Sequence, residues 1–558
     1  MRLIGRVELR DGVPTAVHPF LEDGPHFGPV AAEVGAWVEV EDGAERVLAH
    51  ADTARAALLA LAARYQLDPL FTEAELEQTR AILAAPGLDD PTLEDLRHLP
   101  LCTIDELTSK DLDQALFVEQ SAEGFVVWYA IADAAWFVPP CTPLFKRALA
   151  QGASYYLPGL VLPMLPRALS EDLISLNPQV DRRAMVFRLS LDAEGESTGT
   201  TLHRALVRSR SKLHFDGVQA WYDGGAPPCA DPQVLTSLSA LEAVGKLRLG
   251  REVRQHVVRY RRAEVELSLG GLGLVALSDL RNDVERYNEQ ISLLANAEGA
   301  RLLLAGRRPE LRPVFRVHEA PARARLYELR ERISALVLLH QLDPARWAWE
   351  PGQALSDYLR QLPDDGPFAG VARAIHRHAL LTNQRSYFQA EPGAHYGVGA
   401  PLYSRFTAPM REVVGVYVHE EAWEAVGLSP SRVPEGLREQ VMEAGNRSRE
   451  VQKRLDRETN RMVLDQLLTH SAGPLSGTIM GLTRTKIHVT LDSPPLDVKI
   501  YRFDQENYMG RPLVLAPDEV SLRDRRGDAV MWRVGDTVRV RALGRNLERD
   551  RWQVVMER

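Results

Sequence analysis

The sequence is 558 residues long, which exceeds what one hydrophobic core usually supports, so we expect about three domains. Apolar residues make up 45% and charged residues 26%, as in ordinary globular proteins, and no apolar run is long enough to predict a membrane span. The N-terminus lacks the apolar stretch of a signal peptide, and three scattered cysteines are too few for a disulfide framework or a zinc site. We therefore expect a cytoplasmic protein.

The net charge of −9 excludes a uniformly basic surface, which is the usual footprint of tight nucleic-acid binding. Basic residues nevertheless gather in residues 248–262, and the last 88 residues hold 15 Lys or Arg against 12 Asp or Glu. A local basic path on an acidic body would still attract a phosphate backbone.

Residues 1–94 predict a small strand-plus-helix domain. The first part alternates polar and apolar positions between glycines and prolines, which indicates short strands. Two helices are predicted to follow, over residues 54–65 and 72–85. The second opens with a capping box of Thr72 and Glu75. A winged-helix-like nucleic-acid-binding module and a plain packing domain both fit this pattern.

Residues 103–115 (TIDELTSKDLDQA) hold three aspartates, Asp105, Asp111 and Asp113, directly after an apolar stretch. Their positions differ by even numbers, so in an extended chain their side chains lie on one face. Such carboxylates repel one another unless a hard cation lies between them, and Mg²⁺ is bound by a few carboxylates and by substrate phosphate oxygens. Two such ions can clamp the attacking and leaving oxygens of a phosphodiester. A solvated acidic loop is the competing interpretation.

Strands give way to long helices between residues 95 and 470, without a clear break. Residues 125–138 form an apolar run that predicts a buried strand, and its one acid, Asp133, either supports the metal ligands or makes a structural hydrogen bond. Glu289 and Asn296, seven positions apart on a predicted helix over residues 283–305, share one face and fit an internal hydrogen-bond network.

Two further segments carry residue types suited to nucleic acids. Residues 152–166 form a Pro- and Gly-rich loop in which Tyr156 can stack on a base or hold a phosphate. Residues 395–411 are glycine-rich and end in Arg411, whose planar fork is suited to a phosphate on which charge develops. A turn without function and a plain surface charge are the respective alternatives.

The pattern switches to short strands after residue 473. We expect strands over residues 475–480, 486–491, 497–503, 537–543 and 553–556. Short strands with small turns and a basic bias predict a β-barrel of the OB type. The aromatic residues Tyr501 and Phe503 alternate with the basic residues Arg484 and Lys486, the combination that single strands need, although such aromatics can also be barrel core.

Several of these segments, in this order, resemble the ribonuclease II family. They are TIDELTSKDLDQA, AIAD (130–133), YLPGLVLPMLPRALSEDLISLNP (156–178), VRSRSKLHFDGVQ (207–219), LLANAEGA (293–300), FRVHEAP (315–321), and HYGVG with FTAPMR (395–411). The resemblance implies an α+β multidomain protein. Its RNB catalytic domain, a mixed sheet surrounded by helices, would span residues 95–470, and a C-terminal OB-fold RNA-binding barrel would span residues 471–558.

The resemblance also implies a processive hydrolase that takes single-stranded RNA 3′ end first and releases nucleoside 5′-monophosphates. Asp105, Asp111 and Asp113 are then expected to bind Mg²⁺, with Mn²⁺ as the alternative metal. Tyr156 is expected to fix the 3′-terminal nucleotide and Arg411 to lie beside the scissile phosphate. Neither a membrane nor an obligate protein partner is expected.

The chain departs from the family pattern in its N-terminal domain, which is too short for the two cold-shock barrels of many relatives, and at several positions, Val413 and Gly415 among them. Gln114 stands where the family usually has a fourth aspartate, so the expected metal ligand offers a carbonyl oxygen without a charge. Glu412 follows Arg411 where a second arginine is usual, and Asp456 stands for a glutamate of the late helix that contacts RNA. The alternatives are an RNB-fold protein that binds RNA with weak or no nuclease activity, and a phosphodiesterase for other nucleic acids.

Overall fold

A computed structural model describes residues 2–20, 26–41, 43–261, 264–270, 273–279, 281–306, 311–429, 432–471, 473–527 and 529–557. The chain forms two compact units that alternate along the sequence. The first consists of Met1–Arg254, Arg281–His318 and Ser386–Leu455, and the second of Gln255–Leu280, Glu319–Arg385 and Asp456–Arg558. Residues 319–385, which we expected within the catalytic domain, thus group with the C-terminal strands, while the division into three domains stays a prediction.

The first unit begins with an antiparallel sheet in the order β3-β2-β1-β4-β5. Its strands are β1 (Arg2–Arg10), β2 (Val13–Val17), β3 (His26–Pro29), β4 (Trp37–Glu41) and β5 (Ala44–Ala49), and the helices α1 (Ala54–Arg64) and α2 (Glu73–Ala84) follow. The predicted capping box of α2 is present, since Thr72 N–H donates to the Glu75 carboxylate at 2.7 Å. In the described part of residues 2–49 no helix separates the strands, and a nucleic-acid-binding role of winged-helix type stays a prediction.

A mixed sheet in the order β14-β7-β8-β9-β12-β13-β6 forms the centre of the first unit, as the predicted fold class requires. Its strands are β6 (Glu94–Asp95), β7 (Cys102–Asp105), β8 (Gln114–Ser121), β9 (Gly124–Ala132), β12 (Asp181–Asp192), β13 (Ser197–Arg208) and β14 (Ser211–His214). At the two edges of the sheet, β14 pairs in parallel with β7 and β6 pairs in parallel with β13. The inner strand pairs are antiparallel. The strand predicted over residues 125–138 ends at Ala132, because α3 (Ala134–Phe137) begins after Asp133.

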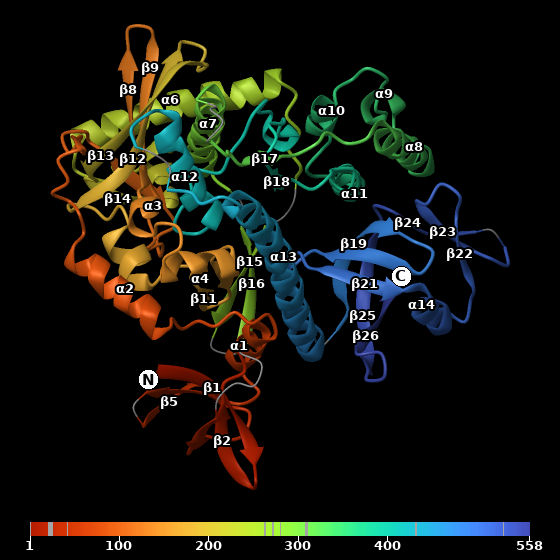
Figure 1. The fold of residues 1–558 in the computed structure, drawn as a ribbon. Coiled ribbons are helices and arrows are strands. Elements are labelled where there is room, and N and C mark those ends of the chain that lie inside the picture. Colours follow the sequence, from red (N-terminus) through yellow and green to blue (C-terminus); the bar gives the residue numbers. More distant parts are fainter. Residues whose placement is uncertain are drawn as a thin grey trace. The chain divides into compact units, whose positions relative to one another are not determined.

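Helices surround this sheet (Figure 1). They are α3, α4 (Pro143–Gln151), the π-helix η1 (Ala168–Leu173), α5 (Phe215–Tyr222), α6 (Pro232–Arg254), α7 (Asp283–Ala305), the 3₁₀ turn η2 (Tyr396–Val398), α12 (Val413–Ala425) and the first part of α13 (Leu437–His470). Two short antiparallel strand pairs belong to the same unit: the hairpin of β10 (Tyr155–Leu157) with β11 (Leu160–Leu162), and the pair of β17 (Phe315–Val317) with β18 (Tyr387–Gln389), whose strands are far apart in the sequence. Helix α6 packs on β8, where Val118 N–H donates to Ser237 Oγ at 2.8 Å.

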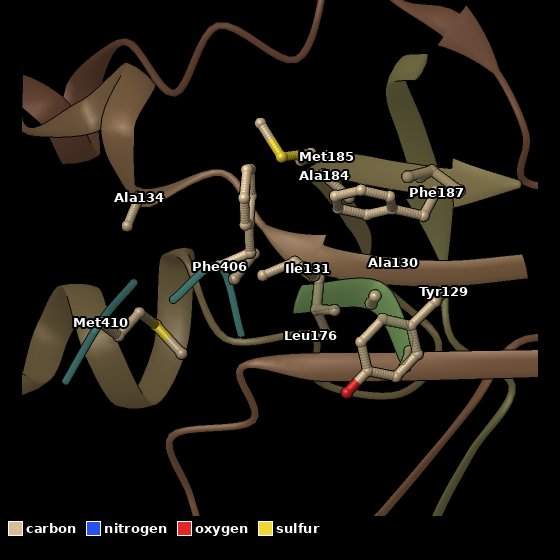
Figure 2. Packing of buried hydrophobic residues seen from close by; sticks show 14 of the residues in the cluster. Tyr129, Ala130, Ile131, Ala134, Leu176, Ala184, Met185, Phe187, Phe406 and Met410 are labelled. Carbon is tan, nitrogen blue, oxygen red and sulfur yellow. The ribbon is translucent and has the colours of Figure 1, made fainter. Parts of the chain in front are cut away.

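The segment before α12 is anchored in the core of this unit. Figure 2 shows the Phe406 ring among side chains of β9 and β12, with Met410 in the same cluster. The rings of Phe187 and Phe406 meet edge to face with centroids 5.5 Å apart, and Phe406 is fully buried. Gly299 of α7 makes room for this packing, because a Cβ there would lie 2.4 Å from the Phe406 ring. Burial of two large apolar side chains stabilises the segment by about 3–6 kcal/mol.

In its described residues, the second unit combines helices with three sheets. Its helices are α8 (Arg323–Leu339), α9 (Pro344–Trp347), α10 (Leu355–Gln361), α11 (Ala369–Leu380), the later part of α13 and α14 (Arg502–Met509). Its strands are β15 (Glu264–Gly270), β16 (Gly273–Asp279), β19 (Leu475–Leu482), β20 (Lys486–Leu491), β21 (Asp497–Tyr501), β22 (Leu513–Leu515), β23 (Ser521–Asp524), β24 (Val530–Arg533), β25 (Thr537–Asn546) and β26 (Arg551–Glu557). Among the described residues, no helix is both long enough and apolar enough to cross a membrane.

The C-terminal strands pair in the order β21-β20-β19-β25-β26, the connectivity of an OB fold. Side chains connect β26, at one end of this order, to β21 at the other end and to α14. The Arg551 guanidinium of β26 lies 3.7 Å from the ring centroid of Tyr501 in β21, and the Gln505 side chain exchanges two hydrogen bonds with the Met556 backbone. The strand predicted to reach Phe503 instead ends at Tyr501, where α14 follows.

Candidate active site

The three aspartates come from the β7–β8 hairpin. Asp105 is the last residue of β7, and Asp113 directly precedes β8, whose Leu116 pairs with Cys102. Ser175 fixes the loop between the strands, because its Oγ donates to Lys110 O at 2.7 Å and accepts from Leu112 N–H at 3.0 Å. The carboxylates therefore lie close together through a hairpin, not through the single extended stretch that their even spacing suggested.

The guanidinium of Arg411 lies among these carboxylates, as the sequence predicted for an arginine of the site. Its Nε is 2.9 Å from Asp113 Oδ2 and 3.0 Å from Asp111 Oδ2, and its Nη2 is 3.6 Å from Asp105 Oδ2. Nη2 also donates to the backbone oxygen of Asp111 at 2.9 Å. One positive charge thus faces three negative ones, and the group keeps an excess of negative charge.

Asp113 is the most deeply buried of the three, with 3% of its surface exposed. Burial raises the pKa of Asp113 to about 7; Arg411 acts in the opposite direction, and Asp111 adds to the increase. Its Oδ1 accepts from Met410 N–H at 3.1 Å, whereas its Oδ2 makes no well-aligned hydrogen bond among the described residues and has the Arg411 guanidinium as its ion-pair partner. A buried carboxylate is costly unless such a positive charge compensates it.

A hard divalent cation fits this donor set, because the available atoms are carboxylate oxygens, and the buried Oδ2 of Asp113 makes no well-aligned hydrogen bond among the described residues. In the described ranges, however, no three acidic, histidine or cysteine side chains surround a common metal position. The reason is that the Arg411 guanidinium lies between the carboxylates. A cation and Arg411 would therefore share the same aspartates.

Gln114 lies beside this group, but its amide is engaged by protein atoms. Its Nε2 donates to Thr407 O, and its Oε1 accepts from Tyr129 OH at 2.7 Å and from Ser292 Oγ at 3.4 Å. Burial raises the pKa of Tyr129, which keeps its hydroxyl protonated as a donor. A role of Gln114 as metal ligand stays a prediction.

Tyr156 is at the edge of the site. It lies on β10, 44% of its surface is exposed, and its hydroxyl donates to Asp111 Oδ2 at 2.9 Å. The Arg411 guanidinium is 6.0 Å from the centroid of the tyrosine ring. The hydrogen bond fixes an exposed aromatic face beside the carboxylates.

Asn296 fixes the segment that carries Arg411. Its Oδ1 accepts from the backbone N–H groups of Phe406 at 2.6 Å and Thr407 at 3.3 Å. Its Nδ2 donates to Thr407 Oγ1 at 2.9 Å and to Tyr403 OH at 3.1 Å. The predicted internal network is thus confirmed for Asn296, but its connection to the site could not be derived from sequence, because the partners are more than 100 positions away.

Asp133 has a structural role. It is fully buried, 3.7 Å from Arg183 Nε and 4.0 Å from Arg204 Nε. Arg183 in turn lies 4.0 Å from the centroid of the Trp136 ring. Neither carboxylate oxygen makes a hydrogen bond with the described residues, so the predicted structural hydrogen bond is not found and ion pairs with two arginines stand in its place.

The remaining predicted residues belong to the second unit, and their RNA-binding roles stay predictions. Asp456 is exposed on α13, and Arg484 is exposed between β19 and β20. Phe503 is 59% exposed on α14. Tyr501 has the Lys486 ammonium 5.2 Å and the Arg551 guanidinium 3.7 Å from its ring centroid. Two cations thus lie over the Tyr501 ring, which leaves less of it accessible to a stacking base. Phe503 is the more accessible aromatic residue.

A cavity of about 480 Å³ connects these features of the first unit. Asp105, Asp113, Gln114 and Arg411 line it, together with Tyr156. Arg316, Arg405, Glu412 and Arg449 line it as well. Carboxylates and guanidiniums thus face the same space, which suits a ligand that carries phosphates and their counterions.

Comparison with known proteins gives the family. The RNB domain model matches residues 93–426. Ribonuclease R of Vibrio parahaemolyticus is 27% identical over 482 residues, which cover 81% of this chain and 55% of that protein, so the chain spans about half the length of the curated relatives it matches. The structure of Mycoplasma genitalium RNase R in complex with ribose methylated single-stranded RNA matches with a TM-score of 0.81 at 20% identity, covering 100% of this chain and 90% of that one.

A further match is yeast Ssd1, described as a pseudonuclease, with a TM-score of 0.65 at 14% identity over 94% of this chain and 68% of that one. These structural matches show the fold alone. The family model covers more than half of the 558 residues and includes the three aspartates and Arg411. The chain therefore belongs to the RNB-domain family.

Proposed function

We propose that this protein is a processive, hydrolytic 3′ to 5′ exoribonuclease of the cytoplasm that degrades single-stranded RNA to nucleoside 5′-monophosphates. Mg²⁺ is its proposed cofactor, with Mn²⁺ as an alternative. One observation carries the proposal: Asp105, Asp111 and Asp113 converge on Arg411 at a cavity large enough for a nucleotide. The ribonuclease R relatives support it, and one solved relative is described as a complex with single-stranded RNA.

The charged residues of the site have distinct roles in this proposal. Asp105, Asp111 and Asp113 would hold Mg²⁺, which when bound lowers the pKa of a water and neutralises charge on the leaving oxygen. Arg411 donates to the non-bridging oxygens of the scissile phosphate, where charge develops during attack. Its contacts with the carboxylates are exchanged for phosphate oxygens in that step.

Tyr156 orients the 3′-terminal nucleotide. Its hydroxyl is held by Asp111 and its ring is 44% exposed, so a base can stack on a face of fixed position. Stacking on an aromatic ring tolerates every base, as a processive enzyme requires. The stacked nucleotide then presents its phosphate toward Arg411.

Binding of RNA with weak or no cleavage is the second candidate. The engaged amide of Gln114, which replaces an expected aspartate, favours it, as does the likeness to a pseudonuclease. The variant Gln114→Asp separates the two candidates. An enzyme with one weak metal site cleaves before the change and needs less Mg²⁺ for half-maximal rate after it, whereas a protein that only binds RNA because of Gln114 is inactive at every Mg²⁺ concentration before the change.

The first test is a time course on single-stranded RNA labelled at its 5′ end, with Mg²⁺ and in parallel with EDTA. A second copy labelled at its 3′ end identifies the first product by thin-layer chromatography. We expect shortening from the 3′ end and immediate release of labelled monophosphate, only with metal. RNA that binds in a gel shift but stays intact would refute the enzyme in favour of the binding protein.

A further inference from the structure

Four charged residues of the cavity have no role in the mechanism proposed above. Arg316 lies on β17, Arg405 and Glu412 lie before α12, and Arg449 lies on α13. We call these four residues the basic cluster. It brings three guanidiniums and one carboxylate to the cavity that Asp105, Asp113 and Arg411 also line. We call Asp105, Asp113 and Arg411 the acidic wall of the cavity, which carries a net negative charge, and the basic cluster its basic wall, which carries a net positive charge.

The single carboxylate of the basic cluster is committed to one arginine. Arg405 Nε donates to Glu412 Oε1 at 2.9 Å. Arg449 instead donates to Ser386, with Nη1 2.8 Å from Oγ and 3.2 Å from the backbone oxygen, and Arg316 Nη2 is 3.4 Å from the same Oγ. In the part of the chain that the structure describes, no carboxylate forms an ion pair with Arg316 or Arg449.

Arg316 and Arg449 are two half-buried like charges that both contact Ser386 Oγ. Burial and, to a smaller extent, the positive charge of Arg449 lower the pKa of Arg316 to about 10. Burial and Arg405 also lower the pKa of Arg449. Burial alone would raise the pKa of Glu412, but the three arginines hold it below its ordinary value, so Glu412 stays ionised. One carboxylate still cannot neutralise three guanidiniums.

Arg316 also has an unused donor. Its Nε is buried and makes no hydrogen bond with any described residue. A guanidinium presents its donors as a planar fork that matches the oxygens of a phosphate, and a buried donor without an acceptor is costly to maintain. An anion with several acceptor oxygens would satisfy Nε and remove the repulsion between the two arginines.

We propose that the basic cluster is a second phosphate subsite, which binds the RNA phosphate next to the scissile one through Arg316 and Arg449. This inference rests on the proposed function. Both walls line one cavity of about 480 Å³, and Arg411 and Glu412 are consecutive residues, so one nucleotide can reach from the aspartates to the basic cluster. The bound group is either the neighbouring phosphodiester of the strand or a phosphate at the 3′ end of the RNA.

Binding without cleavage tests this subsite. In EDTA, the affinity for short fluorescent single-stranded RNA is measured by anisotropy for the wild type, Arg449→Met and Arg316→Met. We expect each variant to bind about tenfold more weakly, because one charge-assisted contact is lost. The slope of log affinity against log salt should fall by about 0.7, the value for one phosphate contact on a single strand.

The matched control is Arg447→Met. Arg447 is exposed on the same helix two positions before Arg449, donates to Leu149 O and Ala150 O, and does not line the cavity. Its replacement removes the same charge and should leave both affinity and salt slope unchanged. Arg449→Lys retains the charge without the fork, so it should restore the slope but not the full affinity, provided that thermal unfolding shows both variants folded.

Three RNA ligands identify the bound phosphate: one with a 3′-hydroxyl, one with a 3′-phosphate, and one with a single uncharged methylphosphonate at the neighbouring linkage. If Arg449 binds the neighbouring phosphodiester, the methylphosphonate weakens the wild type but not Arg449→Met. If it binds a terminal phosphate, the 3′-phosphate strengthens only the wild type. Equal responses of wild type and variant to both ligands would overturn the subsite. Wild-type protein that binds none of the ligands would overturn the proposed function itself.

Discussion

Replacing Asn296 by alanine tests whether the segment before α12 sets the position of Arg411. The amide of Asn296 is fully buried and accepts from the backbone N–H groups of Phe406 and Thr407 at 2.6 and 3.3 Å. Alanine removes the acceptor but leaves both donors in the interior. Each unsatisfied buried donor costs about 1–3 kcal/mol, so we expect the variant to lose about 3 kcal/mol of stability.

The loss of rate should exceed what the loss of stability explains. Thr407 is four residues before Arg411, and the guanidinium works only if it meets the scissile phosphate. A displacement of about 1 Å at a reacting group costs about a hundredfold in rate. We therefore expect Asn296→Ala to retain RNA binding and to cleave about a hundredfold more slowly at a temperature where it is folded.

Urea unfolding and a single-turnover cleavage assay measure the two effects. The control is Glu289→Gln on the same helix, where the carboxylate is 30% exposed and 3.7 Å from Arg281, so its removal should cost less than about 1 kcal/mol and leave the rate unchanged. A folded Asn296→Ala variant with the wild-type rate would refute the link between this hydrogen-bonded segment and Arg411.

Three more predictions follow from the site. Asp113→Asn should abolish cleavage and spare RNA binding, since it removes a ligand charge but little volume, and normal turnover in a cleavage assay would contradict the metal assignment. Tyr156→Ala should weaken RNA binding about tenfold in anisotropy, whereas Tyr156→Phe retains the stacking face and should bind normally. Burial lowers the pKa of His419 from 6.5 to about 4, so the folded protein takes up this proton less readily than the unfolded chain. Stability present above pH 6.5 should therefore fall by about 3 kcal/mol as the pH drops to 4, and pH-dependent urea unfolding of His419→Gln should lack this component.

The chemistry of the acidic cluster could be predicted because its members are close in sequence and chemically alike. Their geometry could not. Even spacing predicted one face of an extended stretch, whereas Asp105 ends β7 and Asp113 precedes β8, so the turn of the hairpin brings them together. Arg411 could be assigned only from the family resemblance, because nothing local to residues 395–411 indicates the aspartates, which lie about 300 positions earlier.

Secondary structure could be predicted where a segment carried both a helical periodicity and a capping residue. The helix predicted over residues 283–305 coincides with α7, which a hydrogen-bonded cap begins. The strand predicted over residues 497–503 is wrong at its last two residues, because aromatic residues such as Phe503 favour strands in local statistics. Residues 502–509 form α14, where Gln505 bonds the backbone of Met556, 51 positions away. A contact of this range decides the conformation and leaves no signal in a local window.

Glu412 shows why a departure from a family motif has to be judged by its neighbours. A carboxylate in place of a usual arginine reverses the charge at that position, which by itself argues against binding a phosphate there. Arg405 is bonded to Glu412, however, and Arg316 and Arg449 lie close enough to lower its pKa. The wall of the cavity keeps an excess of positive charge, so position 412 does not favour the protein that only binds RNA. That alternative then depends on Gln114, which Gln114→Asp tests directly.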